Sequence, residues 1–206
     1  MRLIQNIIFA IVIVVIVFLV YNYFYSNKIH LSSLKSAKKS ETVKSTKLPS
    51  SKVSNNFAYS IWFYVKDWQY RLTEPKELLV RAPKSGNNNY NPKITLAAYE
   101  NNININVTTY PISGSSSTDD SPSTDGSPSN HDCTIRNFPL QKWVNLIVSL
   151  NGRTLDVYID GKLVRTCVLP GVAKSYPDAD INITPDGGFA GWTSNLQYWA
   201  NPLNPQ

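Results

Sequence analysis

The sequence predicts an all-β domain, a two-sheet antiparallel sandwich, preceded by one transmembrane helix. Three observations lead to this prediction. A meander of three strands joined by two tight turns occupies residues 143–168, and further short strand-like segments separated by turn formers run from 57 to 198. A long apolar segment without charged residues lies near the N-terminus. The first two are typical of a β-sandwich and the third of a membrane anchor.

The meander alternates apolar and polar residues with the period of a half-buried strand. Asn151-Gly152 and Asp160-Gly161 are the dipeptides that favour two-residue type I′ hairpin turns. With Asn151-Gly152 as the first turn, Val148 should face Leu155. With Asp160-Gly161 as the second, Asp156 should face Arg165, and the remaining expected pairs are Leu146 with Val157, Val144 with Ile159, and Val157 with Val164.

Seven further segments have the length and composition of strands. The first, 57–65, is apolar on both of its alternating faces, which favours a central strand whose second face is also covered. The others are 77–81, 93–99, 103–109, 134–138, 181–184 and 189–198. No amphipathic helical period interrupts this series, so we expect one jelly-roll domain over 57–206.

Two segments read differently from the strands. Residues 111–131 are dense in Ser, Asp, Pro and Gly and predict a long mobile surface loop. Residues 28–56 are rich in Lys, Ser and Thr and predict a solvated stem. An alternative for the stem is electrostatic contact with anionic lipid or an acidic partner, with Lys28, Lys35, Lys38 and Lys39 flanking the membrane.

The N-terminal segment, residues 1–27, predicts a single membrane span. No charged residue occurs from Leu3 to Asn27, and a helix of about 20 apolar residues crosses a bilayer. A cleaved signal peptide has a shorter apolar region that ends at small residues, whereas this one ends in aromatic residues suited to a membrane interface. The lysines that follow favour a cytosolic C-terminal domain by the positive-inside rule.

The net charge of +6 is concentrated outside the folded part. Eight of the 20 Lys and Arg residues precede Val53, but only one of the 14 acidic residues does, which leaves 12 basic against 13 acidic residues in the rest. A nucleic-acid-binding domain carries its basic excess on the fold. We therefore expect no nucleic-acid partner.

Three segments, in order, resemble the laminin-G-like, concanavalin A-like lectin/glucanase family. They are FAYSIWFYVKDW at 57–68, WVNLIVSLNGRTLDVYIDGKLV at 143–164 and GGFAGWTSNLQYWANPLNPQ at 187–206. The resemblance implies a two-sheet jelly roll that binds sugars or proteins. Joined to an anchor and to the C-T-I-R and R-T-C motifs, the domain also resembles virion proteins, of the minor capsid type, from large DNA viruses.

This resemblance implies two function classes. In the first, the chain is a structural virion protein that links an internal viral membrane to the capsid, with other capsid or membrane proteins as partners. In the second, it is a membrane-displayed lectin with glycan partners. The aromatic residues that could stack on sugar rings are Trp68, Tyr70, Trp192, Tyr198 and Trp199. No cofactor is expected in either class.

Catalysis and metal binding are not predicted. Glucanases place two carboxylates on one strand face in an E-x-D-x-x-E pattern, and this chain lacks that pattern. Its two histidines, His30 and His131, fall in the predicted stem and loop, where they could not serve a rigid site. Asp119, Asp120 and Asp125 lack the spacing of a calcium loop.

The two cysteines are candidates for a disulfide. Cys133 opens a predicted strand, and Cys167 closes the meander, where we expect it opposite Thr154. Two free thiols are the ordinary state in the cytosol. Large DNA viruses commonly carry their own thiol oxidation system, so the viral resemblance favours the bond.

Overall fold

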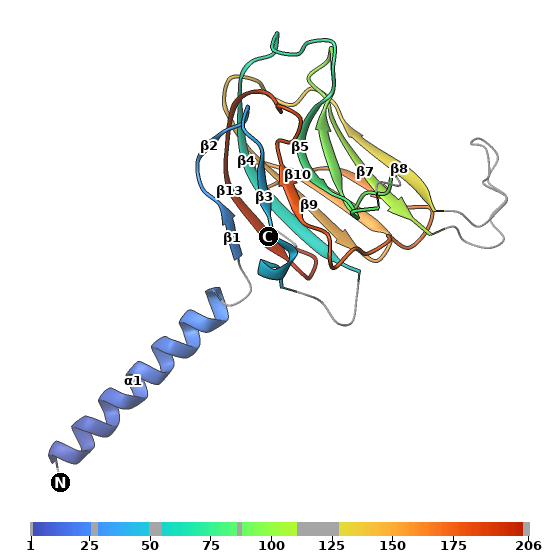
Figure 1. Cartoon of the computed structure of the whole chain (residues 1–206). Helices are drawn as coiled ribbons and strands as arrows, with labels where there is room; N and C mark the ends of the chain where they lie inside the picture. Colours follow the sequence, from blue (N-terminus) through green and yellow to red (C-terminus); the bar gives the residue numbers. More distant parts are fainter. Residues whose placement is uncertain (1, 26–28, 50–54, 86–87, 111–127, 204–206) are drawn as a thin grey trace.

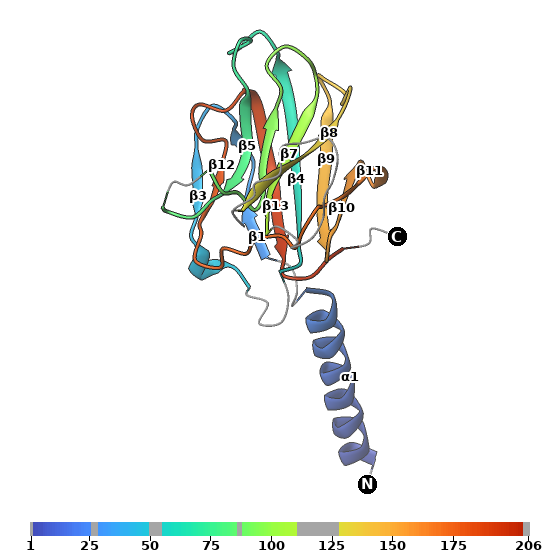
Figure 2. The same cartoon turned by 90° about the vertical axis from the view of Figure 1, so that its right-hand side faces the viewer.

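In the computed structural model, residues 2–25, 29–49, 55–85, 88–110 and 128–203 are described. A helix, α1 (Arg2–Tyr25), precedes a β-sandwich and projects away from it in both views (Figures 1 and 2). Side chains of α1 are described at 5–6 and 9–21. Within these residues, and elsewhere in the described chain, no helical segment is long and apolar enough to cross a membrane. The anchor predicted for 1–27 therefore stays a prediction.

The sandwich consists of two antiparallel sheets packed face to face, as the sequence predicts (Figure 2). The first, sheet A, has the order β1-β13-β4-β9-β10-β11, with β2 also paired to β13. Its strands are β1 (Ile29–Ser32), β2 (Lys35–Ser36), β4 (Phe57–Asp67), β9 (Trp143–Asn151), β10 (Thr154–Ile159), β11 (Lys162–Val168) and β13 (Ala190–Trp199).

Sheet B has the order β3-β12-β5-β6-β7-β8. Its strands are β3 (Glu41–Val43), β5 (Lys76–Arg81), β6 (Lys93–Leu96), β7 (Ile103–Thr109), β8 (Ser129–Ile135) and β12 (Ile181–Ile183). A short 3-10 helix, η1 (Ser45–Lys47), follows β3.

The core lies between the sheets and is built from the inward residue of every second position. On β4 these include Tyr59, Ile61 and Phe63, each at most 1% exposed. Phe63 packs edge-on against Phe138 and Phe189, with ring centroids 5.5 and 6.3 Å away. Such aromatic pairs add to the free energy gained from buried area, so this cluster fixes how the sheets are stacked.

The predicted stem, residues 28–56, is largely part of the sandwich, which corrects the sequence-based interpretation. β1 pairs with β13 and β3 pairs with β12, so the segment supplies an edge strand to each sheet. Ala37 is fully buried and Val43 is 5% exposed in the common core. The segment is polar because edge strands expose most of their side chains. Residues 28 and 50–54 lie outside the described part.

The predicted loop 111–131 is also shorter than expected at its C-terminal end. β8 begins at Ser129, and its residues pair in register with β7, including Thr108 with Asn130. The Thr108 hydroxyl donates to Asn130 Oδ1 at 2.5 Å, so polar side chains hold this part of the hairpin together. Residues 111–127, with the three aspartates considered for calcium, lie outside the described part.

The first hairpin of the meander turns one residue later than predicted. Asn151 is the last residue of β9 and pairs with Thr154, so Gly152-Arg153 forms the two-residue loop. Gly152 has φ +60, which suits a glycine at the first loop position. Val148 therefore faces Val157 instead of Leu155, and Leu146 faces Ile159 instead of Val157. The partner changes by two residues, which keeps every apolar side chain on the face that was predicted.

The second hairpin turns at Asp160-Gly161 as predicted, with φ +51 and +79. Beyond Tyr158↔Leu163, however, a bulge leaves Val164 without a partner, and Val157 pairs with Arg165. The predicted Asp156–Arg165 pair is therefore wrong. Asp156 instead faces Thr166, whose hydroxyl donates to its carboxylate at 2.5 Å.

Candidate functional site

The outer face of sheet A carries aromatic side chains at one end. Residues on β4 alternate, so that Phe63 and Val65 point into the core while Trp62 and Tyr64 point outward. The same alternation on β9 turns Val144 inward and Trp143 outward. Both outward tryptophans are more than a third exposed, Trp62 at 37% and Trp143 at 40%. The second face of the first strand is thus open here, although the sequence predicted that it was covered.

Three of these rings lie at one level across three adjacent strands. Tyr64 of β4 pairs in register with Trp192 of β13 on one side and with Trp143 of β9 on the other. The ring centroid of Tyr64 lies 5.6 Å from that of Trp192 and 5.8 Å from that of Trp143. We call Trp192, Tyr64 and Trp143 the aromatic row.

Close contact between two backbones positions the row. A Cβ atom on Gly191 would lie 1.9 Å from the carbonyl oxygen of Tyr64, so only glycine fits there. The pairing of β13 with β4 shifts between Ala190 and Gly191, just before Trp192. Glycine at this shift therefore allows β13 to approach β4 closely enough for Trp192 to lie beside Tyr64.

The chemistry of the row is that of a partly exposed apolar surface with polar neighbours. The rings are tilted by 58° and 55° to each other, so they form a ridged surface and not a flat one. Lys66 Nζ lies 5.9 Å from the Trp192 ring. Aromatic rings exposed together, beside a cation and strand hydroxyls, can stack on the C–H faces of a ligand while polar groups bind its rim.

The structure does not bring the five sequence-predicted stacking residues together. Trp192 belongs to the row. Tyr198 and Trp199 are buried, at 6% and 8% exposure, because they lie at the end of β13 that is covered, and they cannot stack on a sugar from solvent. Trp68 packs on Phe138, with centroids 5.9 Å apart and the Lys76 ammonium 4.4 Å from its ring. Tyr70 donates to the Gly187 carbonyl at 3.3 Å.

The predicted membrane-flanking lysines have partners within the sandwich. Lys35, on β2, forms an ion pair with Glu41. The ammonium of Lys38 lies 4.4 Å from the centroid of the Tyr70 ring. The Lys39 carbonyl accepts a hydrogen bond from the Thr184 hydroxyl at 3.0 Å. Lys28 lies outside the described residues.

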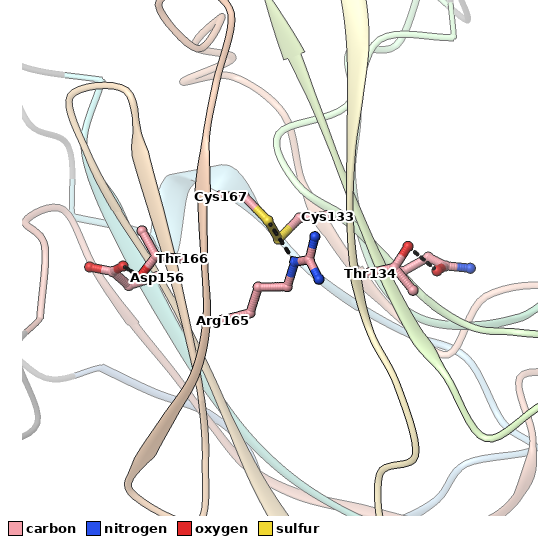
Figure 3. The surroundings of a disulfide bond; sticks show 7 residues. Cys133, Thr134, Asp156, Arg165, Thr166 and Cys167 are labelled. Carbon is pink, nitrogen blue, oxygen red and sulfur yellow. Dashed lines mark hydrogen bonds between the residues drawn. A yellow bond between two sulfur atoms is a disulfide. The ribbon is translucent and has the colours of Figure 1, made fainter.

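Cys133 and Cys167 form a disulfide across the sandwich (Figure 3). Cys133 lies on β8 and Cys167 on β11, the outermost strands of the two sheets on the same side. Their Cα atoms are 6.1 Å apart, within the range of disulfides. The bulge at Val164 makes this geometry available, because it places Cys167 opposite the inward Leu155 instead of the predicted Thr154. The bond therefore closes one edge of the sandwich.

Carboxylates in the described part of the chain are mostly engaged with cations. Glu77 and Lys93 form an ion pair at 2.6 Å, and Asp160 and Lys142 form one at 3.3 Å. Asp180 accepts the backbone N–H of Ser45 at 2.8 Å and the Lys44 ammonium at 3.0 Å. These contacts, the Ser45 N–H first, hold the pKa of Asp180 below its usual value. No cluster of three metal-ligating side chains occurs among the described residues.

Comparison with known families classifies the chain. A laminin G family model, described as the concanavalin A-like lectin/glucanases superfamily, matches residues 38–206. The chain therefore belongs to this superfamily, as its sequence motifs indicated. The match begins within the predicted stem, in agreement with the strands found there. No curated protein matches the chain significantly.

Solved structures show the same fold at low sequence identity. The botulinum neurotoxin serotype D binding domain is 14% identical, with a TM-score of 0.56 over 87% of this chain and 40% of that one. The binding domain of botulinum neurotoxin DC in complex with SialylT is 15% identical, with a TM-score of 0.51 over 73% and 33%. Domain 4 of AbnA, an extracellular arabinanase from Geobacillus stearothermophilus, is 20% identical, with a TM-score of 0.48 over 77% and 67%. The chain spans about a third of the length of the first structures it matches.

Proposed function

We propose that this chain is a membrane-anchored, non-enzymatic module that binds carbohydrate through the aromatic row. The observation that carries this proposal is the exposure of three aromatic rings at one level of sheet A, with Trp62 beside them. Neighbouring strands lie about 4.8 Å apart, so the row extends about 10 Å from Trp192 to Trp143. A ligand that covers this length is an oligosaccharide and not one sugar ring.

Membership in the superfamily supports a binding role, since its description includes lectins. One structural neighbour, the binding domain of botulinum neurotoxin DC, was solved in complex with SialylT. At this low identity the likeness concerns the fold alone, so the ligand class for this chain comes from its own aromatic row.

The superfamily also includes glucanases, and the strands around the row argue against that activity. Glycoside hydrolysis needs two carboxyl groups on opposite sides of the scissile bond. The strands that carry the row, β4, β9 and β13, contain one acidic residue, Asp67, at the end of β4. Two carboxylates therefore cannot be supplied by these strands, and the row binds its ligand without cleaving it.

The proposed anchor is α1 with its flanking residues, 1–27. The described side chains from Phe9 to Tyr21 are large, apolar and exposed, with Phe9 at 68% and Phe18 at 63%. Such a surface is unstable in water, because each exposed apolar side chain forgoes about 1.5–3 kcal/mol of burial. A lipid bilayer is the surrounding that the charge-free sequence from Leu3 to Asn27 fits.

Alkaline extraction of membranes tests the anchor. The full chain should stay in the membrane pellet, while a chain that starts at Ser26 should be released. Release of the full chain would contradict the anchor. Protease added to the cytosolic side of sealed membranes should digest the sandwich, and full protection would reverse the proposed orientation.

A place between a viral inner membrane and the capsid, with capsid proteins as partners, stays a prediction from the resemblance. None of the described contacts bears on it, and the aromatic row favours a glycan partner instead. A neighbour list from cross-linked membranes or particles would test that role.

A glycan array with the full chain in detergent micelles tests the binding role. Trp143→Ala and Trp192→Ala should each weaken binding of the oligosaccharides found by about tenfold, because each removes a stacking ring. Tyr99→Ala is the matched control, since Tyr99 is 69% exposed and lies outside the row. Equal binding by the row variants and the control would contradict the site, and an array without hits would contradict the ligand class.

A further inference from the structure

Arg81, at the end of β5, is a buried cation with neutral partners. It is 8% exposed, and its guanidinium donates to the carbonyls of Ala179 at 3.2 Å and Pro177 at 3.3 Å. It also donates to the hydroxyls of Tyr59 at 3.1 Å and Tyr198 at 3.4 Å. No ion pair among the described residues involves Arg81.

Neutral acceptors leave the charge of Arg81 uncompensated. Buried charges in proteins are normally paired, because removing an ion from water is costly without an opposite charge. Burial raises the pKa of the Tyr59 hydroxyl well above its usual value, so Tyr59 stays neutral near Arg81. The positive charge is therefore available to an anion from outside the chain.

A pocket of about 420 Å³ gives such an anion access to Arg81. Arg81, Asn91 and Tyr198 are among its lining residues. The amide nitrogen of Asn91 donates to the Lys174 carbonyl, which leaves its Oδ1 buried and without a hydrogen-bond partner. Because the Tyr198 hydroxyl accepts from Arg81, its own proton can be donated to a ligand. The pocket thus offers a cation, a donor and an unused acceptor.

The pocket lies at the end of the sandwich where the chain arrives from α1. Tyr198 pairs in register with Ile29, the first residue of β1, and α1 ends at Tyr25. Figure 1 shows α1 leaving the sandwich at this end, close to η1. Two residues of η1, Ser45 and Thr46, also line the pocket. The aromatic row lies farther along the sheet, since Trp192 precedes Tyr198 by six residues on β13.

We propose that this pocket binds the phosphate group of an anionic membrane lipid. The phosphate oxygens would accept from Arg81 and Tyr198, and a hydroxyl or ammonium of the same headgroup would donate to Asn91 Oδ1. Phosphate is the common chemistry of lipid headgroups and of free phosphate, and the proximity to α1 favours the lipid. The choice of lipid rests on the proposed anchor, whereas binding of phosphate by Arg81 does not.

Native mass spectrometry of the full chain, released from nanodiscs of phosphatidylcholine and phosphatidylglycerol, tests this proposal. The wild type should retain phosphatidylglycerol, and Arg81→Gln should retain at least about tenfold less. Arg136→Gln is the matched control, because it removes one exposed positive charge away from the pocket. Asp178→Asn should retain more, since Asp178 lines the pocket and its charge opposes an anion. That variant keeps the test valid if Arg81→Gln misfolds.

A second arm measures thermal stabilisation by inorganic phosphate in nanodiscs of phosphatidylcholine alone. Stabilisation that requires Arg81, without retention of phosphatidylglycerol, would support the phosphate site and overturn the lipid as its source. Equal lipid retention by the wild type, Arg81→Gln and Asp178→Asn, with no effect of inorganic phosphate, would overturn the proposal. Release of the full chain by alkaline extraction would refute the anchor separately and leave the phosphate arm decisive for the pocket.

Discussion

Removing the disulfide should destabilise the sandwich strongly, and the structure allows the effect to be estimated. Cys133 and Cys167 are separated by 34 residues, and their bond links the edge strands β8 and β11. The chain-entropy relation gives on the order of 4 kcal/mol for a closed loop of this length. The double variant Cys133→Ala/Cys167→Ala is the appropriate change, because a single substitution would leave one buried thiol unpaired.

The effect should concentrate on β11. Cys167 is the one buried residue of this strand, and β11 otherwise pairs with β10 alone. Without the bond, β11 should exchange its amide protons faster than the central strand β4. Urea unfolding of the two proteins measures the free-energy difference, and hydrogen exchange locates it. A loss below about 1 kcal/mol, or full alkylation of both cysteines in the unreduced wild type, would refute this reasoning.

Three further predictions concern the core, the N-terminal strands and acid stability. Leu146→Ala, at a fully buried position, should lower the free energy of unfolding by about 2–5 kcal/mol in urea titrations, and a loss below about 1 kcal/mol would place Leu146 outside the core. A chain that starts at Ser26 should melt cooperatively, whereas one that starts at Val53 lacks β1, β2 and β3 and should not; identical melts would contradict the corrected boundary. The lowered pKa of Asp180 stabilises the fold above its unfolded value of 3.8, and this contribution is lost as pH falls through the folded pKa. Asp180→Asn should therefore be less stable than the wild type at neutral pH but lose less stability on acidification, and parallel pH profiles would contradict the role of this carboxylate.

The sheet interior could be predicted from the sequence because alternation is a local property. Apolar residues at every second position identified β4, β9 and β10 and the residues that they bury. The hairpin register was less accessible, because Asn151-Gly152 and Gly152-Arg153 are both acceptable loops with glycine at a positive φ. The two registers bury the same faces, so the apolar pattern could not distinguish them.

The bulge at Val164 has no signal in the sequence, since LVRTCV is compatible with an unbroken strand. Its cause is tertiary, because only the bulged register directs Cys167 toward Cys133. The strands of the predicted stem were missed for a similar reason. Their stability comes from pairing with β13 and β12, residues far along the chain, and not from local propensity.

The aromatic row was half accessible from the sequence. Alternation places Trp62 and Tyr64 on the face opposite Phe63, which the sequence shows. Whether that face is covered depends on other segments. Near Ser149 the C-terminal segment reaches this face, since Leu203 N–H donates to its hydroxyl at 2.9 Å, whereas Trp143, at the other end of the same strand, is exposed. Exposure is therefore a property of the assembled sandwich.

Saturation-transfer NMR on an oligosaccharide found by the array tests the central claim most directly. With the full chain in detergent micelles, irradiation of the aromatic protons should transfer saturation to the C–H protons of the sugar rings. Trp143→Ala/Trp192→Ala should abolish this transfer, and Tyr99→Ala should preserve it. Transfer that persists unchanged in the double variant would show that the sugar binds elsewhere and would contradict the aromatic row as the binding site.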